Sequence, residues 1–249
     1  MIRALLIFVL SALPAAAEEV VAGLSMNRVS ITTSFDGSEI LIFGAVKRET
    51  KIPEEPPLHV IVTVAGPSKP ITVRRKARRF GIWVNTAAVE VDAAPTFYAV
   101  ATSAPWAEVI TNVEDLRHRI SIPRAIRSVG VDTKGGEDFV EALIRIRTAE
   151  DSYQLRLGSV EVSEATLFRT SIALPANLTE GDYAARFFLT RGGEVIDIHE
   201  TVIEVQKVGL ERFLFTLARE RPLIYGLMSL AIAVAAGWAA SAAFRLIRF

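Results

Sequence analysis

A long uncharged segment near the C-terminus dominates the hydrophobicity pattern of the chain. Residues 222–244 read PLIYGLMSLAIAVAAGWAASAAF and include no charged side chain. As an α-helix this segment would be about 34 Å long, which exceeds the roughly 30 Å hydrocarbon core of a bilayer. An uncharged run of more than about 18 residues is rarely the core helix of a soluble domain. The pattern therefore predicts one transmembrane helix over 222–244 and a short tail over 245–249.

A second, shorter apolar run lies at the N-terminus. Residues 1–17 combine the basic Arg3, a largely apolar stretch of ten residues (ALLIFVLSAL) and the small residues Ala15-Ala16-Ala17. This layout is typical of a secretory signal peptide that is cleaved after Ala17. Ten residues are too few to span a bilayer as a helix. A retained N-terminal anchor is the alternative interpretation.

The export signal predicts the orientation of the protein. We expect the body to be exported and the segment 222–244 to stop transfer, with the tail 245–249 in the cytoplasm. The distribution of positive charge does not favour this orientation, since Lys207, Arg212, Arg219 and Arg221 precede the span and only two arginines follow it. The signal outweighs these charges, because it engages the export machinery first and long domains translocate largely regardless of charge.

Short alternating segments fill residues 18–103. The runs EILIFGAV, LHVIVTVA and FYAVAT are rich in β-branched and aromatic residues, and turn signals separate them. About six short strands with turns every 8–12 residues favour a β-sandwich of immunoglobulin-like kind. We predict that residues 18–103 form this first domain.

The periodicity becomes helical after Pro105. Apolar residues at helical spacing predict helices over 105–118 and 137–150, and strands resume after Tyr153 as a β-meander with a tight turn at Gly192-Gly193. We therefore predict a second β-rich domain, or a second half of one domain, with two helices over 104–207. The whole chain is expected to be mainly β with some α, with one C-terminal transmembrane helix.

The segment 208–221 (VGLERFLFTLARER) links the predicted body to the span. Leu210, Phe213, Leu214 and Leu217 share one face of a helix, whereas the remaining faces are largely polar. One interpretation is an amphipathic juxtamembrane helix that lies on the membrane surface. The other is a helical extension of the span that is broken or bent by Pro222.

Charge and cysteine content narrow the function classes. The chain has 28 basic and 28 acidic residues and no cysteine. Three of the arginines lie in the signal and the tail, so the body carries 25 basic against 28 acidic residues, a net charge of −3. This balance argues against nucleic-acid binding. The lack of cysteine excludes disulfides, thiol catalysis and cysteine metal sites.

A basic run is the most unusual feature of the predicted body. Five cations fall within six residues, and the segments on both sides have strand character, so we expect a hairpin tip. The run could contact an anion, a lipid headgroup or an acidic partner. Alternatively it is a solvated loop that protects an edge strand. The residues are Arg74, Arg75, Lys76, Arg78 and Arg79.

No motif indicates catalysis or metal binding. His59, His118 and His199 are far apart in the sequence. Asp197 and His199 share one face of a predicted strand, but two ligands without a third are weak evidence for a metal site. The chain also lacks a GxSxG elbow and a glycine-rich phosphate loop. We expect no catalytic residue, no metal and no cofactor, and predict that the protein is not an enzyme.

The predicted span carries a stripe of small residues. Ser229, Ala233, Gly237 and Ser241 recur every four residues and therefore share one helix face. Small faces let two helices approach closely, so the stripe is a candidate surface for a polytopic membrane partner. Alanine-rich spans also show such stripes by chance.

Several segments resemble a known family when they are taken in order. They are NRVSITTSFDGSEILIFGAV, VRRKARRFGIWVN, FYAVATS, LFRTSIALPANLTEGDYAARFFLTRGGEV and the PLIYGL start of the span. Together they resemble a family of alphaproteobacterial transmembrane proteins. The resemblance implies a bacterial inner-membrane location, a periplasmic body, one C-terminal span and no assigned activity. It also implies a sulfite-exporter-like anion transporter as a partner.

The leading hypothesis is a single-pass inner-membrane protein that serves as a non-enzymatic accessory or scaffold for a membrane partner. The bilayer and a polytopic protein are the expected partners. The alternative is a membrane-anchored module that binds a periplasmic ligand or the cell envelope. An enzyme of unknown type is the third hypothesis, which would require a pocket that linear spacing does not reveal.

Overall fold

The computed structural model describes residues 18–32, 35–48, 55–128 and 136–247. The predicted signal peptide, residues 1–17, and the last two residues of the predicted tail lie outside this range. The chain divides into two compact units. The first comprises the chain up to Val29 and Asp36–Val205, and the second comprises Ser30–Phe35 and Gln206–Phe249.

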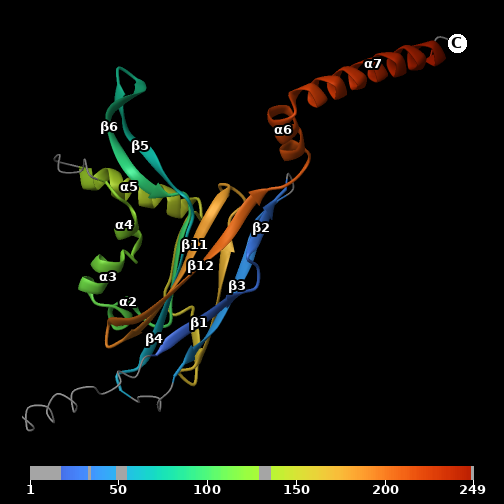
Figure 1. The fold of residues 1–249 in the computed structure, drawn as a ribbon. Helices are drawn as coiled ribbons and strands as arrows, with labels where there is room; N and C mark the ends of the chain where they lie inside the picture. Colours follow the sequence, from blue (N-terminus) through green and yellow to red (C-terminus); the bar gives the residue numbers. More distant parts are fainter. Residues whose placement is uncertain (1–17, 33–34, 49–54, 129–135, 248–249) are drawn as a thin grey trace, which may run out of the picture. The chain divides into compact units, whose positions relative to one another are not determined.

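β-Strands are the commonest element of the described chain and form three sheets (Figure 1). One sheet has four strands, in the order β1 (Glu19–Leu24), β3 (Ser38–Lys47), β10 (Leu167–Leu174) and β9 (Glu161–Ser163). A second has six, in the order β2 (Arg28–Ile31), β12 (Glu194–Lys207), β11 (Gly181–Arg191), β4 (Leu58–Ala65), β7 (Tyr98–Thr102) and β8 (Tyr153–Arg156). The third is a long hairpin of β5 (Ser68–Arg79) and β6 (Ile82–Pro95). The mainly β character with some helix is therefore confirmed.

Alternation along the strands determines which side chains enter the core. In β3, Ile40 and Ile42 are buried, whereas Leu41 and Phe43 between them are exposed. This is the period-2 pattern of a sheet with one buried face. The inward face of the four-stranded sheet meets that of the six-stranded sheet, where the rings of Phe168 and Phe187 lie 6.2 Å apart. Burial of such apolar side chains is the main stabilising contribution to the body.

Pairing between distant strands unites the two predicted domains. β3 pairs antiparallel with β10, and β4 pairs antiparallel with β11. Residues 18–103 therefore do not form a sandwich alone, because their central strands are completed by strands from residues 104–207. The two predicted domains are two parts of one folded unit, and the immunoglobulin-like arrangement predicted for 18–103 stays a prediction.

Four helices pack beside the six-stranded sheet. They are α2 (Trp106–Val109), α3 (Asn112–His118), α4 (Ile122–Ala125) and α5 (Gly136–Ala149). The single helix predicted over 105–118 is interrupted, because Ile110 is extended and the Thr111 side chain caps α3 by accepting from the Glu114 amide. The helix predicted over 137–150 is α5, shifted by one residue.

Two buried tyrosines fasten neighbouring segments to the six-stranded sheet: Tyr98 holds the helical segment, and Tyr153 holds the end of β6. The Tyr98 hydroxyl donates to the Ile120 carbonyl oxygen, and the Tyr153 hydroxyl donates to the Pro95 carbonyl oxygen, both at 2.8 Å. Burial raises the pKa of Tyr98 and raises the pKa of Tyr153 to about 12. Both hydroxyls therefore stay protonated and act as donors throughout the physiological pH range.

The second unit contains two helices. α6 (Leu210–Glu220) ends at Arg221, whose backbone is non-helical, and α7 (Pro222–Ile247) begins at the next residue. Proline suits the first position of a helix because its missing N–H would have no intrahelical partner there. The helix is therefore broken just before Pro222, and both interpretations of the segment 208–221, an interfacial helix and a broken extension of the span, stay predictions.

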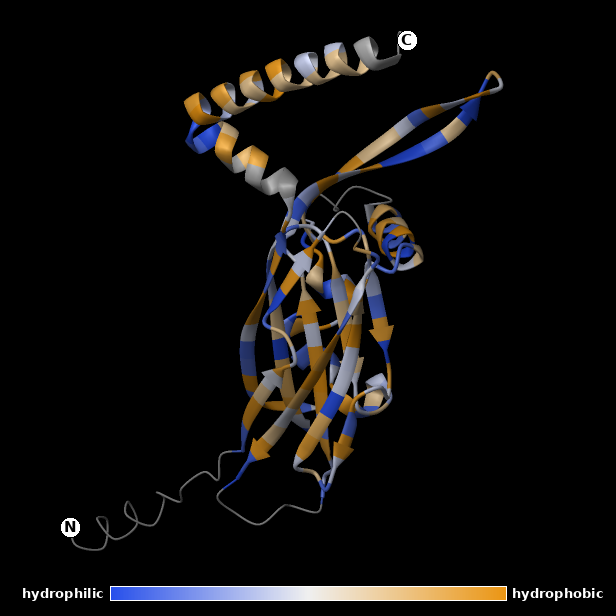
Figure 2. Ribbon diagram, turned by 90° about the vertical axis from the view of Figure 1, so that its right-hand side faces the viewer, coloured by the Kyte–Doolittle hydropathy of each residue, from blue (hydrophilic) through white to orange (hydrophobic). Residues whose placement is uncertain are grey.

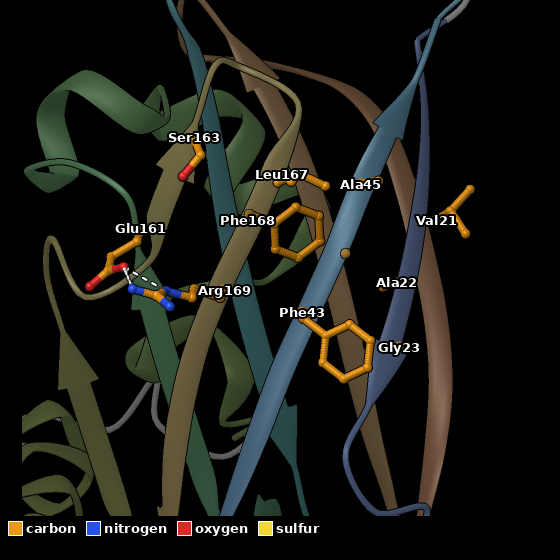
Figure 3. A pocket seen from close by; sticks show the side chains of 11 residues that line it. Val21, Ala22, Gly23, Phe43, Ala45, Glu161, Ser163, Leu167, Phe168 and Arg169 are labelled. Carbon is orange, nitrogen blue, oxygen red and sulfur yellow. Dashed lines mark hydrogen bonds and ion pairs between the residues drawn. The ribbon is translucent and has the colours of Figure 1, made fainter.

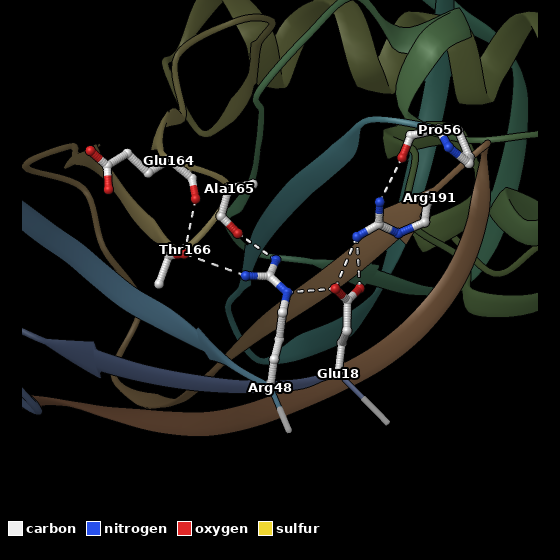
Figure 4. Close-up of polar contacts among 7 residues, drawn as sticks. All are labelled: Glu18, Arg48, Pro56, Glu164, Ala165, Thr166 and Arg191. Atoms are coloured by element: carbon white, nitrogen blue, oxygen red, sulfur yellow. Dashed lines mark hydrogen bonds and ion pairs between the residues drawn. The ribbon is translucent and has the colours of Figure 1, made fainter. Parts of the chain in front are cut away.

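A buried ionic cluster closes one end of the first unit (Figure 4). The Glu18 carboxylate accepts hydrogen bonds from Arg48 at 2.5 Å and from Arg191 at 2.9 Å, and all three side chains are nearly buried. Arg48 also donates to the Ala165 carbonyl oxygen, and Arg191 donates to the Pro56 carbonyl oxygen. We call Glu18, Arg48 and Arg191 the Glu18 cluster; it joins the start of β1 to the ends of β3 and β11.

The Glu18 cluster predicts a large effect of one substitution. Glu18→Ala should lower the free energy of unfolding by about 3 kcal/mol or more, because it leaves two buried arginines without their carboxylate. Glu19→Ala is the matched control; its pair with Lys47 is exposed, so its effect should stay within about 1 kcal/mol. Thermal or denaturant unfolding of the purified full chain measures both, and equal effects would contradict the prediction.

The same cluster predicts acid sensitivity. Burial alone would raise the pKa of Glu18, but hydrogen bonds and charge from Arg48 and Arg191 outweigh it and hold the pKa below 4.5. Because the folded pKa is lower than the unfolded one, the cluster contributes its full stability above about pH 4.5 and loses it as the pH falls further. Unfolding curves of wild type and Glu18→Ala should therefore converge below that pH.

Candidate functional site

The basic run lies in a strand and not at a hairpin tip. Arg74 to Arg79 form the last part of β5, and the turn itself consists of Phe80 and Gly81. The prediction of a basic loop at 74–79 is therefore corrected. The reason is that strand pairing continues to Arg79↔Ile82, so only two residues remain for the turn. The β5–β6 hairpin extends away from the two sheets as an arm (Figure 2).

One of the five cations is already engaged where the arm contacts α5, a region that we call the root of the arm. Arg75 donates to the Asp138 carboxylate at 3.0 Å, and its guanidinium lies 4.7 Å from the centroid of the Phe139 ring. Both partners belong to the start of α5. Arg74, Lys76, Arg78 and Arg79 form no ion pair with a carboxylate in the part of the chain that the structure describes. These four remain available to an external anion.

An apolar groove of about 710 Å³ lies on the outward face of the four-stranded sheet (Figure 3). Its sides include the exposed Val21, Phe43 and Leu167. The ionisable side chains at its edge are Glu161 and Arg169, which pair with each other at 2.6 Å. The groove therefore offers apolar contact rather than an arrangement of acids and bases for catalysis.

Two glycines shape this sheet around aromatic rings. A Cβ on Gly23 would lie 2.9 Å from the Phe43 ring, and one on Gly44 would lie 2.7 Å from the Val21 carbonyl oxygen and closer still to the Phe168 ring. Neither position has room for a side chain without displacing its neighbour. The rings of Phe43 and Phe168 therefore fill the places that side chains at these glycines would occupy.

The predicted pair Asp197 and His199 has other contacts. The Asp197 carboxylate accepts a hydrogen bond from the Val20 amide at 2.6 Å, which ties β1 to β12. The His199 ring lies against Phe187, with the centroids 5.9 Å apart. Among the described residues, no group of three or more histidine, aspartate or glutamate side chains is placed to hold a metal.

The predicted transmembrane segment is helical and exposed along its length. Pro222–Ala243 is long and apolar enough to cross a membrane, and none of it is buried by the rest of the described chain. The small stripe Ser229, Ala233, Gly237 and Ser241 lies on this helix, and nothing lies within 4 Å of a Cβ built on Gly237. The Ser229 hydroxyl donates to the Gly226 carbonyl oxygen, so it needs no partner outside its own helix.

A mainly β body joined to one exposed apolar helix defines a single-pass membrane protein. The chain belongs to the family described as "Putative transmembrane protein (Alph_Pro_TM)", whose model matches residues 19–246. The family suggested by the sequence resemblance is thus confirmed.

Two further comparisons add no argument about function. No curated protein sequence matches the chain. The solved structure of the sporulation control protein Spo0M from Bacillus subtilis is similar with 11% identity and a TM-score of 0.28, over 81% of this chain and 54% of that one. The chain thus spans about half the length of that protein, and a likeness this weak supports no conclusion.

Sequence reasoning missed three features of the body. They are the exposed apolar side chains of Phe80, Ile82 and Trp83 at the end of the arm, the groove on the four-stranded sheet and the Glu18 cluster. The run RRFGIWVN did contain a signal for the tip, because an aromatic residue and a glycine separate two strand-like segments. The groove and the cluster join residues more than 100 positions apart, and no local pattern marks them.

The root of the arm predicts unequal effects of two neighbouring substitutions. Arg75→Ala removes a half-exposed ion pair and a cation–π contact, so we expect a loss of about 1 kcal/mol in the free energy of unfolding. For a body of this size the melting temperature should fall by about 2–4 °C. Arg74→Ala, which removes an equal charge without these contacts, should change it little. Equal shifts in a thermal melt would contradict this account.

Proposed function

We propose that the protein is a non-enzymatic accessory or scaffold protein of the bacterial inner membrane. Its β-rich body would lie in the periplasm, and its single span would pack against a polytopic membrane protein. The observation that carries the proposal is the apolar, exposed surface of α7: Pro222–Ala243 is long and apolar enough to cross a membrane, and no residue of it is buried. The small stripe with open space at Gly237 supports close approach of a second helix.

The proposed orientation rests on the N-terminal sequence. The basic and apolar residues of 1–17 have the layout of a signal peptide, with cleavage after Ala17. The C-terminal tail would then be cytoplasmic. Glu18, the residue that follows the predicted cleavage site, takes part in the buried Glu18 cluster, so we propose that the folded body includes the start of the mature chain.

The partner class is a membrane-embedded transporter. The family resemblance suggests a sulfite-exporter-like anion transporter, and the four cations of the basic run without carboxylate partners among the described residues would suit a site beside an anion pathway. This part of the proposal concerns only which membrane protein is the partner. Packing through the stripe would suit any polytopic partner with a matching small surface.

A second candidate function is supported by the groove on the four-stranded sheet. A space of about 710 Å³ with apolar sides is in the size range of small-ligand sites. In this case the body would bind an apolar periplasmic ligand, and α7 would serve only as an anchor. Replacing residues 222–244 with an unrelated span separates the two functions, because only the accessory function requires this helix sequence.

The stripe provides the sharper test of the accessory function. Gly237→Leu places a bulky side chain in the middle of the small face, so we expect loss of the complex recovered by crosslinking in native membranes and affinity capture. Ala235→Leu adds similar bulk on the opposite face of the same helix and should leave the complex intact. Recovery of the same partner with Gly237→Leu would refute packing through the stripe.

A further inference from the structure

The turn of the β5–β6 arm exposes an aromatic side chain in an unfavourable backbone conformation. Phe80 and Gly81 have φ angles of 49° and 87°, which correspond to a two-residue turn with both residues in the left-handed region. Asparagine and glycine are the usual residues at the first position, whereas φ > 0 is strained for a bulky residue. The Phe80 ring is fully exposed and gains no packing against the described residues in return.

Two more large apolar side chains lie beside Phe80. Ile82 and Trp83 follow the turn in β6 and are 65% and 69% exposed. Pairing places Ile82 opposite Arg79 and Trp83 opposite Arg78, so each face of the ribbon carries one apolar residue and one arginine just behind the turn. We call Phe80, Ile82 and Trp83 the apolar tip.

The charge behind the apolar tip has one sign. Residues 69–89 include six cations and no acidic residue, although the body as a whole is slightly acidic. Arg75 is held at the root by Asp138, which leaves the cations nearest the tip free of carboxylate partners within the described chain. An apolar end with cations on both faces behind it is complementary to a layer that is apolar inside and anionic at its surface.

We propose that the apolar tip inserts into the interfacial region of an anionic lipid bilayer, with Arg78 and Arg79 on the lipid phosphates. Two residues of strand span roughly 7 Å from Phe80 back to Arg78, which matches the depth of about 5–10 Å at which interfacial segments lie. Aromatic rings favour this region, and arginine side chains reach from it to phosphates.

Two observations favour a bilayer over an acidic protein as the occupant. An acidic protein surface would neutralise the cations but leave the apolar tip in contact with water or charge. The chain also belongs to a single-pass membrane family, so a bilayer is always attached to the molecule. The inference goes beyond the proposed function, because this contact with lipid needs no protein partner.

The chain's own tryptophans make the contact measurable. The three tryptophans are Trp83, Trp106 and Trp238, and the last lies in α7. The double variant Trp106→Phe/Trp238→Phe leaves Trp83 as the sole emitter in the full chain. After reconstitution into protein-free vesicles of phosphatidylcholine and phosphatidylglycerol, we expect a blue-shifted emission that brominated lipids quench and aqueous iodide does not.

Two matched comparisons control this experiment. Trp83→Phe/Trp238→Phe leaves only Trp106, in α2 of the body, whose emission should not respond to brominated lipid. In the Trp83-only chain, Arg78→Glu/Arg79→Glu should abolish the quenching, whereas Arg78→Lys/Arg79→Lys should largely retain it because the charge is kept. Raising the salt from about 0.1 M to 1 M should weaken the contact, since the screening length falls from about 10 Å to 3 Å.

The outcomes separate lipid contact from the alternatives. If iodide quenches Trp83 and brominated lipid does not, in a chain that melts like wild type, the inference is overturned and an acidic protein becomes the occupant to seek. If quenching is equal in pure phosphatidylcholine and survives the glutamate variant, the inference that Arg78 and Arg79 require anionic lipid is wrong. Because these vesicles hold no partner protein, the result does not depend on whether the proposed accessory function is correct.

Discussion

Pairing between strands that are far apart in the sequence holds the body together. β3 and β4 lie in the first half of the chain, and their partners β10 and β11 come more than 100 residues later. The chain has no cysteine, so no disulfide can replace this pairing. The inward faces of the two sheets, the helices packed beside them and the Glu18 cluster all depend on it, because each combines residues from both halves.

Local sequence patterns predicted the helices and strands better than they predicted which strands pair with each other. The alternation in 39–46 and 58–65 and the helical spacing in 137–150 reappear as β3, β4 and α5, since period and propensity are properties of a few adjacent residues. The domain boundary at 103 and the basic loop at 74–79 did not reappear, because strand pairing decides both. A sequence shows that Arg74 to Arg79 are charged, but whether they lie in a turn depends on how far the ladder with β6 continues.

The candidate surfaces of this protein are suited to contact rather than to chemistry. The groove has apolar sides, and its two charged residues, Glu161 and Arg169, pair with each other. The arm carries cations and aromatic residues, and α7 presents small and apolar residues. The buried ionisable groups, by contrast, have structural contacts: Asp115 accepts from the amides of Ile120 and Ser121, and the Glu18 cluster joins strand ends. Contact surfaces of this kind support the accessory function proposed above without assigning a partner.

The arm also has a consequence for how mutations in it can be interpreted. A two-stranded ribbon is marginally stable without a third strand or a packed face, and beyond its root this one has neither. Its outer part can therefore open by local unfolding at a free-energy cost set by its own hydrogen bonds, while the sheets of the body stay closed. Amide protons near Phe80 are therefore expected to exchange faster than those of β4 or β11, whereas global melting reports mainly on the body.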